Sequence, residues 1–77
     1  MSSFVADYTL VIRKLWKEEA KVRGAHRDLL GHAAHGIARF LRCHAKGSDR
    51  DALLALADQA EQVSQICFEY PVPRGQA

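Results

Sequence analysis

The sequence has few residues that would interrupt a helix. Its 77 residues include only two prolines, and both lie near the C-terminus, at positions 71 and 73. Proline inside a helix removes a backbone hydrogen bond and clashes with the preceding turn, so residues 1–70 are free to form long helices. We therefore expect a single helical domain over residues 1–70 and a flexible C-terminal tail over residues 71–77.

Long apolar runs are also missing. No run approaches the roughly 20 apolar residues that a membrane-spanning helix needs. The N-terminus shows no basic segment followed by an unbroken apolar stretch, which is the pattern of a signal peptide. These absences predict a cytoplasmic protein with no membrane partner. In that compartment the two cysteines, Cys43 and Cys67, are expected to remain thiols.

Recognisable catalytic and cofactor motifs are lacking. The chain has no glycine-rich phosphate loop, no serine elbow and no spaced pair of acidic residues. Cys43 and His44 are adjacent, but neighbours on a helix point about 100° apart and cannot form a nucleophile pair. In an antiparallel hairpin Cys43 and Cys67 lie near opposite ends, so they cannot share a zinc ion. We expect no enzyme activity, no bound metal and no cofactor.

What the sequence does contain is a mixture of apolar and charged residues that is typical of a folded protein. Hydrophobic residues make up 48% of the chain and charged residues 26%. The charge is unevenly distributed, because residues 1–47 carry nine Lys/Arg and four Asp/Glu, whereas residues 48–77 carry two and five. Such asymmetry either steers a charged partner or reflects pairing between packed helices.

Apolar residues recur at helical spacing in three segments, at about residues 3–23, 28–46 and 49–70. The first segment has two neighbouring apolar rows, which are Phe4, Tyr8, Val11, Leu15 and Val22, and Val5, Ile12, Trp16 and Ala20. The row of the second segment is Leu30, Ala33, Ala34, Ile37, Leu41 and His44. The third segment has the most regular row, which is Leu53, Leu56, Ala60, Val63, Cys67 and Tyr70.

Residues that begin and end helices lie between these segments. Gly24 predicts the end of the first helix, and Asp28 predicts the N-cap of the second. Gly47 suits the end of the second helix, while Ser48 and Asp51 resemble a capping box for the third. Because this second connection is short, the predicted fold is an all-α antiparallel three-helix bundle. The alternative is one continuous helix through Gly24, giving a long helical hairpin that is completed by dimerisation.

Two features of the first two helices predict a surface for a partner. Ile12 and Trp16 belong to the additional apolar row of the first helix, and the cations Arg13 and Lys17 flank them. Tryptophan and arginine are common among the residues that dominate binding energy. The second feature is a polar row on the second helix, which ends in His35, Arg39, Arg42 and Lys46.

The leading prediction is a small non-catalytic helical interaction module, expected to be a homodimer, that acts as an adaptor, regulator or inhibitor of a larger protein with an acidic surface. Its predicted partner-binding residues are Ile12, Arg13, Trp16, Lys17, His35, Arg39, Arg42 and Lys46. The alternative is a nucleic-acid-binding protein whose basic rows on the first two helices track phosphates. A pI near 8.7 and the lack of helix-turn-helix spacing or an aromatic platform favour the first prediction.

Overall fold

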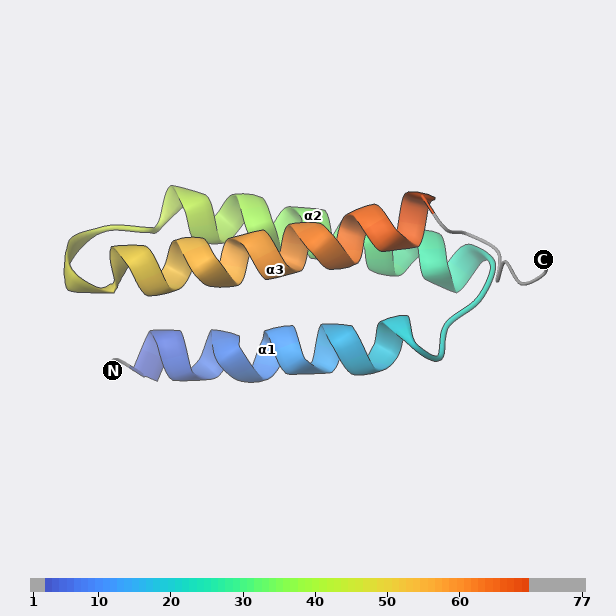
Figure 1. Ribbon diagram of the computed structural model, residues 1–77, viewed down its shortest axis with the longest axis horizontal. Coiled ribbons are helices and arrows are strands. Elements are labelled where there is room, and N and C mark those ends of the chain that lie inside the picture. Colours follow the sequence, from blue (N-terminus) through green and yellow to red (C-terminus); the bar gives the residue numbers. More distant parts are fainter. Residues whose placement is uncertain (1–2, 70–77) are drawn as a thin grey trace.

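The computed structural model describes residues 3–69, which form three long helices. Helix α1 spans Ser3–Glu19, α2 spans Ala25–Cys43 and α3 spans Arg50–Glu69, with a short 3-10 helix, η1, over Gly47–Asp49. The three helices lie along one direction and consecutive helices run antiparallel (Figure 1). The predicted three-helix bundle is confirmed. The alternative of one continuous helix is wrong, because the chain reverses direction between α1 and α2.

The connection between α1 and α2 depends on a glycine. Gly24 has φ 60° and ψ −133°, a conformation that other residues rarely adopt. Its carbonyl accepts the amides of Arg27 at 3.0 Å and Asp28 at 3.3 Å, and these bonds begin the second helix. The helix therefore starts at Ala25 without a side-chain cap, and Asp28 lies in its first turn instead of at the predicted N-cap. The carboxylate of Asp28 still stabilises the positive end of the helix dipole.

The other predicted boundaries also shift by a few residues. Helix α1 ends at Glu19 and not near Arg23, and α2 ends at Cys43 and not at position 46. Gly47, with φ 65°, opens η1, so Ser48 lies inside this short turn. The predicted end of α3 at position 70 and the predicted tail over residues 71–77 lie outside the described residues.

The core is arranged around α3. The predicted row of α3 is buried at Leu53, Leu56, Ala60, Val63 and Cys67, as expected from its spacing. Helix α1 buries Val5, Ile12 and Leu15, while Phe4 and Tyr8 pack against this core and remain partly exposed. The second apolar row of α1 therefore faces the core more directly than the first.

A buried arginine connects the ends of all three helices. Arg27 is only 7% exposed. Its Nη1 donates to the carbonyl oxygen of Glu19 at 3.1 Å, and its Nη2 donates to Glu19 Oε2 at 3.0 Å and to the carbonyl oxygen of Ile66 at 3.3 Å. Glu19 is the last residue of α1 and Ile66 belongs to α3. One guanidinium on α2 thus fixes where α1 ends relative to α3.

Helix α2 approaches α3 closely at Gly31. A Cβ atom at this position would lie 2.8 Å from the tip of the Phe68 ring and 3.1 Å from the Cβ of Cys67. The Phe68 ring is 43% exposed and can move aside, but Cys67 is buried next to the backbone of α3. Gly36, on the same helix, has nothing within 4 Å of such a Cβ. Within the bundle, therefore, packing requires a glycine at position 31 but not at position 36.

Replacing these two glycines by alanine should change stability in opposite directions. Gly36→Ala should raise the free energy of unfolding by about 0.5–1 kcal/mol, because alanine favours the helix and meets no neighbour. Gly31→Ala should lower it by about 1–2 kcal/mol, because the strain of overpacking exceeds the same helical gain. Urea denaturation followed by circular dichroism measures both. An increase for Gly31→Ala would contradict the close contact between α2 and α3.

Candidate functional site

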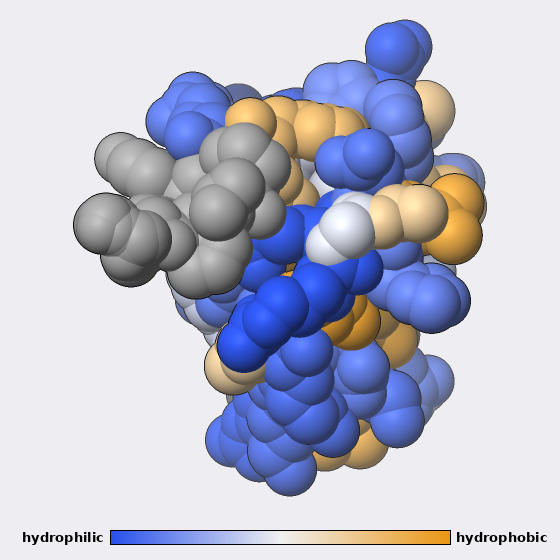
Figure 2. All heavy atoms as spheres, turned by 90° about the vertical axis from the view of Figure 1, so that its right-hand side faces the viewer, coloured by the Kyte–Doolittle hydropathy of each residue, from blue (hydrophilic) through white to orange (hydrophobic). Residues whose placement is uncertain are grey.

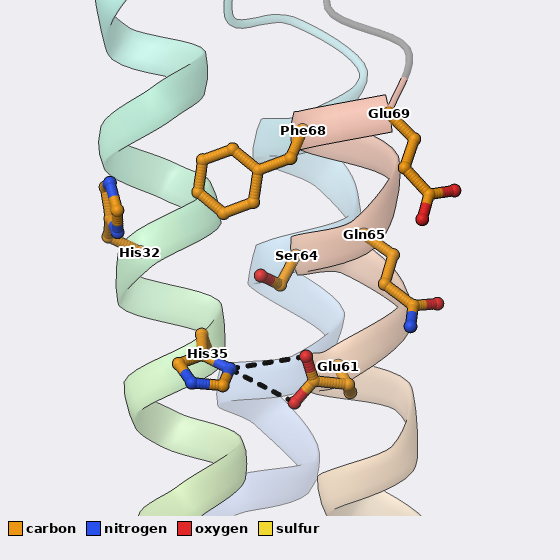
Figure 3. Close-up of a pocket in the computed structure, with 7 residues that line it drawn as sticks. All are labelled: His32, His35, Glu61, Ser64, Gln65, Phe68 and Glu69. Atoms are coloured by element: carbon orange, nitrogen blue, oxygen red, sulfur yellow. Dashed lines mark hydrogen bonds and ion pairs between the residues drawn. The ribbon is translucent and has the colours of Figure 1, made fainter.

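The basic row of α2 contacts acidic residues of α3. Arg42 Nη1 lies 3.2 Å from Glu61 Oε1, and Arg42 Nη2 lies 3.5 Å from Asp58 Oδ1. His35 Nδ1 lies 3.3 Å from Glu61 Oε2, as the dashed lines in Figure 3 show. Of the four side chains that the sequence predicted as a basic row, His35 and Arg42 are thus paired within the chain. Because these pairs are largely exposed, they contribute little to stability but reduce the positive potential of α2.

The other two members of this row, Arg39 and Lys46, are exposed and form no ion pair within residues 3–69. Arg39 lies on α2, but Lys46 lies in the connection that follows α2 and has extended backbone angles, so it does not continue the predicted helical row. The structure therefore does not bring the four basic residues together as one continuous patch. The positive charge of α2 is therefore interrupted where α3 supplies its carboxylates.

A groove of about 380 Å³ lies between α2 and α3 above the His35–Glu61 pair (Figure 3). The ring of His32 packs edge-on against Phe68, with ring centroids 5.0 Å apart. Ser64 also lines the groove but forms no hydrogen bond to His32 or His35. No activated serine is assembled here, and no three His, Cys, Asp or Glu side chains among the described residues are placed to hold a metal ion.

The outer face of α1 is the strongest candidate site. It is lined by Leu10, Arg13, Lys14, Lys17 and Lys21, with Glu18 at its edge, around a shallow groove of about 420 Å³. We call the first five residues the α1 cationic face. Leu10 lies at the centre of this face and is 61% exposed. Within the described chain only Lys21 has an ionic partner, which is Glu18 at 3.6 Å.

The positive charge of this face therefore lacks the compensation that α3 gives to α2. Arg13, Lys14 and Lys17 are all exposed and form no ion pair within residues 3–69. Figure 2 looks along the helices at the end where α1 joins α2, and its lower part, where α1 lies, is almost wholly hydrophilic with few apolar patches. Leu10 is thus an exposed apolar side chain surrounded by cationic side chains.

Ile12 and Trp16, the predicted apolar anchor, both contact the core. Ile12 is only 2% exposed, so it is a core residue and not the surface residue expected from the sequence. Trp16 is partly buried against the core, and its Nε1 donates to Gln59 Oε1 in a long hydrogen bond of 3.4 Å. The physical reason is that α1 packs onto α3 and turns its second apolar row inward.

Sequence reasoning did not single out Leu10. Its signal was present, because Leu10, Lys14 and Lys17 recur at steps of four and three residues and so share one helix face, and Lys21 follows in the turn after α1. An exposed apolar residue does not make a basic helix face more soluble, so solubility does not explain the leucine at position 10. Single exposed leucines are nevertheless ordinary, so the cations around Leu10 are what make it informative.

None of the described helices combines the length and the apolar character that a membrane span requires.

The two cysteines, both free thiols, should differ sharply in reactivity. Cys43 is exposed and Cys67 is fully buried. Burial raises the pKa of the Cys67 thiol, and the nearby Arg27 cation opposes this only in part. Because the thiolate is the reactive form, iodoacetamide at mildly alkaline pH should label the native protein once, at Cys43. Mass spectrometry should find Cys67 labelled only after unfolding, and equal labelling of both in the native protein would contradict this core.

Comparison with models of protein families, with curated proteins and with solved structures finds no match for this chain. No relative therefore suggests a substrate, a partner or an activity. The exposure and charge of the described side chains are the remaining guide to function.

Proposed function

We propose that this protein is a small non-catalytic helical module that binds an acidic surface of a larger protein through the α1 cationic face, as an adaptor, regulator or inhibitor. The observation that carries the proposal is Leu10, 61% exposed among four cations of which only Lys21 is paired within the described chain. Arg13 and Lys17, which the sequence predicted as a charged rim, keep that place, and Leu10 replaces Ile12 and Trp16 as the apolar anchor.

Apolar burial and charge have separate tasks in this proposal. Burying the Leu10 side chain in a pocket of the partner contributes about 1.5–3 kcal/mol to binding. The surrounding cations lie at the rim of the contact, where charges mainly raise the association rate and fix orientation. Carboxylates around an apolar pocket on the partner would complement both features. Lys46, in the connection that follows α2, is exposed and is available as an additional contact.

Nucleic-acid binding is the second candidate, and it rests on the same unpaired cations. Phosphates need only the positive charge and would leave Leu10 without a role. The predicted basic row of α2 supports this candidate less than the sequence suggested, because Arg42 and His35 already contact Glu61. The need for Leu10 distinguishes the two, since phosphate contacts make binding fall steeply with salt but do not require an apolar side chain.

The test compares three variants of the full chain. Lys14→Glu/Lys17→Glu reverses the charge of the face, and Leu10→Ser removes the anchor. Arg23→Glu/Arg50→Glu is the matched control, because it makes the same change in net charge at two exposed positions elsewhere. Circular dichroism should show the same helicity for all four proteins.

We expect a protein partner, captured with the tagged wild-type chain in its native host and then purified, to bind Lys14→Glu/Lys17→Glu and Leu10→Ser at least about 10-fold more weakly. The control should bind within about 2-fold of wild type. Fluorescently labelled duplex and single-stranded DNA and RNA, titrated at two salt concentrations, provide the other arm. Salt-sensitive binding of these probes that Leu10→Ser leaves intact would replace the proposal with nucleic-acid binding.

A further inference from the structure

Helix α2 has a second apolar row, which faces away from the core. It consists of Leu29, Ala33, Gly36, Phe40 and Cys43, and we call it the α2 seam. All five residues are exposed, with Leu29 at 65% and Phe40 at 41%. At 100° per residue they fall within an arc of about 80°. No charged residue interrupts this row.

The spacing of the α2 seam is that of a helix that packs against another helix. Steps of four, three, four and three residues are the pattern of a coiled-coil contact. The seam extends about 21 Å along the helix, which is close to four turns. Ala33 and Gly36 at its middle would let a second helix approach closely, and the space beside Gly36 is open.

The two edges of the α2 seam carry opposite charges. Arg39 and His32 border it on the side of α3, since the His32 ring contacts Phe68 of that helix. Helix α1 borders the other side, since the ring centroids of Tyr8 and Phe40 are 5.7 Å apart. On α1 the exposed Asp7 lies three residues after Phe4 and so shares its side of the helix, and the ring centroids of Phe4 and Phe40 are 6.3 Å apart.

Asp7 and Arg39 lie at nearly the same height along the bundle, because their neighbours Tyr8 and Phe40 are in contact. Neither forms an ion pair with any other residue of the 3–69 range. A twofold axis parallel to the helices would place the Arg39 edge of one copy against the Asp7 edge of another. An axis perpendicular to the helices would instead place the two Arg39 edges together, and each Arg39 would then have no acidic counterpart across the interface.

We propose that the α2 seam binds a second copy of this chain, with the two α2 helices parallel and related by a twofold axis along the bundle. Each seam residue then meets its own equivalent, and Arg39 of each copy pairs with Asp7 of the other. Such an interface is isologous and closes at two copies. It uses a different surface from the α1 cationic face, so it holds whether or not that face binds a protein.

The first experiment measures the association of the purified full chain by sedimentation equilibrium. We expect a dimer with a dissociation constant on the order of 10 µM or tighter. Ala33→Glu should raise this constant at least about 10-fold, because it places a charge opposite its own copy. Ala55→Glu, the same change at an exposed alanine of α3, is the control and should leave it within about 2-fold.

A charge swap tests the proposed edges directly. Arg39→Asp alone should weaken the dimer, because it leaves two carboxylates opposite each other. Adding Asp7→Arg should restore association to within about 3-fold of wild type, since the pair is then reversed but complementary. The rescue distinguishes an ion pair across the interface from loss of folding, which a second substitution would not repair.

Disulfide formation tests the orientation. In the parallel arrangement Cys43 meets its own equivalent, so mild oxidation should cross-link the wild-type dimer, and Cys43→Ser should abolish the cross-link. In an antiparallel arrangement centred between Ala33 and Gly36, Cys43 would instead lie near His26 of the other copy. In the proposed parallel dimer positions 26 and 43 are far apart. His26→Cys/Cys43→Ser mixed with wild type should then give no more cross-linked heterodimer than Cys43→Ser mixed with wild type.

Three outcomes overturn the proposal. A chain that stays monomeric well above the expected constant rules out self-association. A dimer that Ala33→Glu leaves unchanged uses some other surface. A dimer that cross-links efficiently between positions 26 and 43, and not between two copies of Cys43, has the opposite orientation.

Discussion

The arrangement of this protein depends on one buried cation. The guanidinium of Arg27 is taken out of water, which is costly unless its donors are paired. Its partners are the carbonyl and carboxylate of Glu19 and the carbonyl of Ile66, and no acceptor among the described residues contacts its Nε. These donors are satisfied only when the end of α1 and the last turns of α3 are both in place. Arg27 therefore fixes the docking of α1, the helix that carries the candidate site.

The position of α1 determines which charges stay unpaired. With its end fixed, α1 turns Ile12 toward α3 and Lys14 toward solvent. The carboxylates of α3 reach α2, where Glu61 contacts both Arg42 and His35. The uneven charge of the sequence thus has two meanings. Between α2 and α3 the opposite charges form ion pairs within the chain. On α1 the cations Arg13, Lys14 and Lys17 are exposed and have no acidic partner among the described residues.

The sequence predicted the helices and the α3 core because an uninterrupted row of apolar residues permits only one buried face. It did not predict which face of α1 is buried, because two apolar rows lie side by side there and tertiary packing selects between them. The sequence did not predict the role of Arg27, because charged residues are seldom buried. In addition, the second helix was expected to begin at Asp28, one residue after Arg27. The candidate site was half predictable, since Arg13 and Lys17 follow from the helical pattern. The pairing of Arg42 depends on contacts across helices that no spacing rule reveals.

Arg27 and Glu19 interact across the end of the bundle and hold α1 in place. A double-mutant cycle with Arg27→Met and Glu19→Gln, measured by urea denaturation, tests it most directly. We expect a coupling of at least about 1 kcal/mol between the two side chains, in the range expected for residues in contact. A coupling indistinguishable from zero would show that the two substitutions act independently, and that some other interaction docks α1.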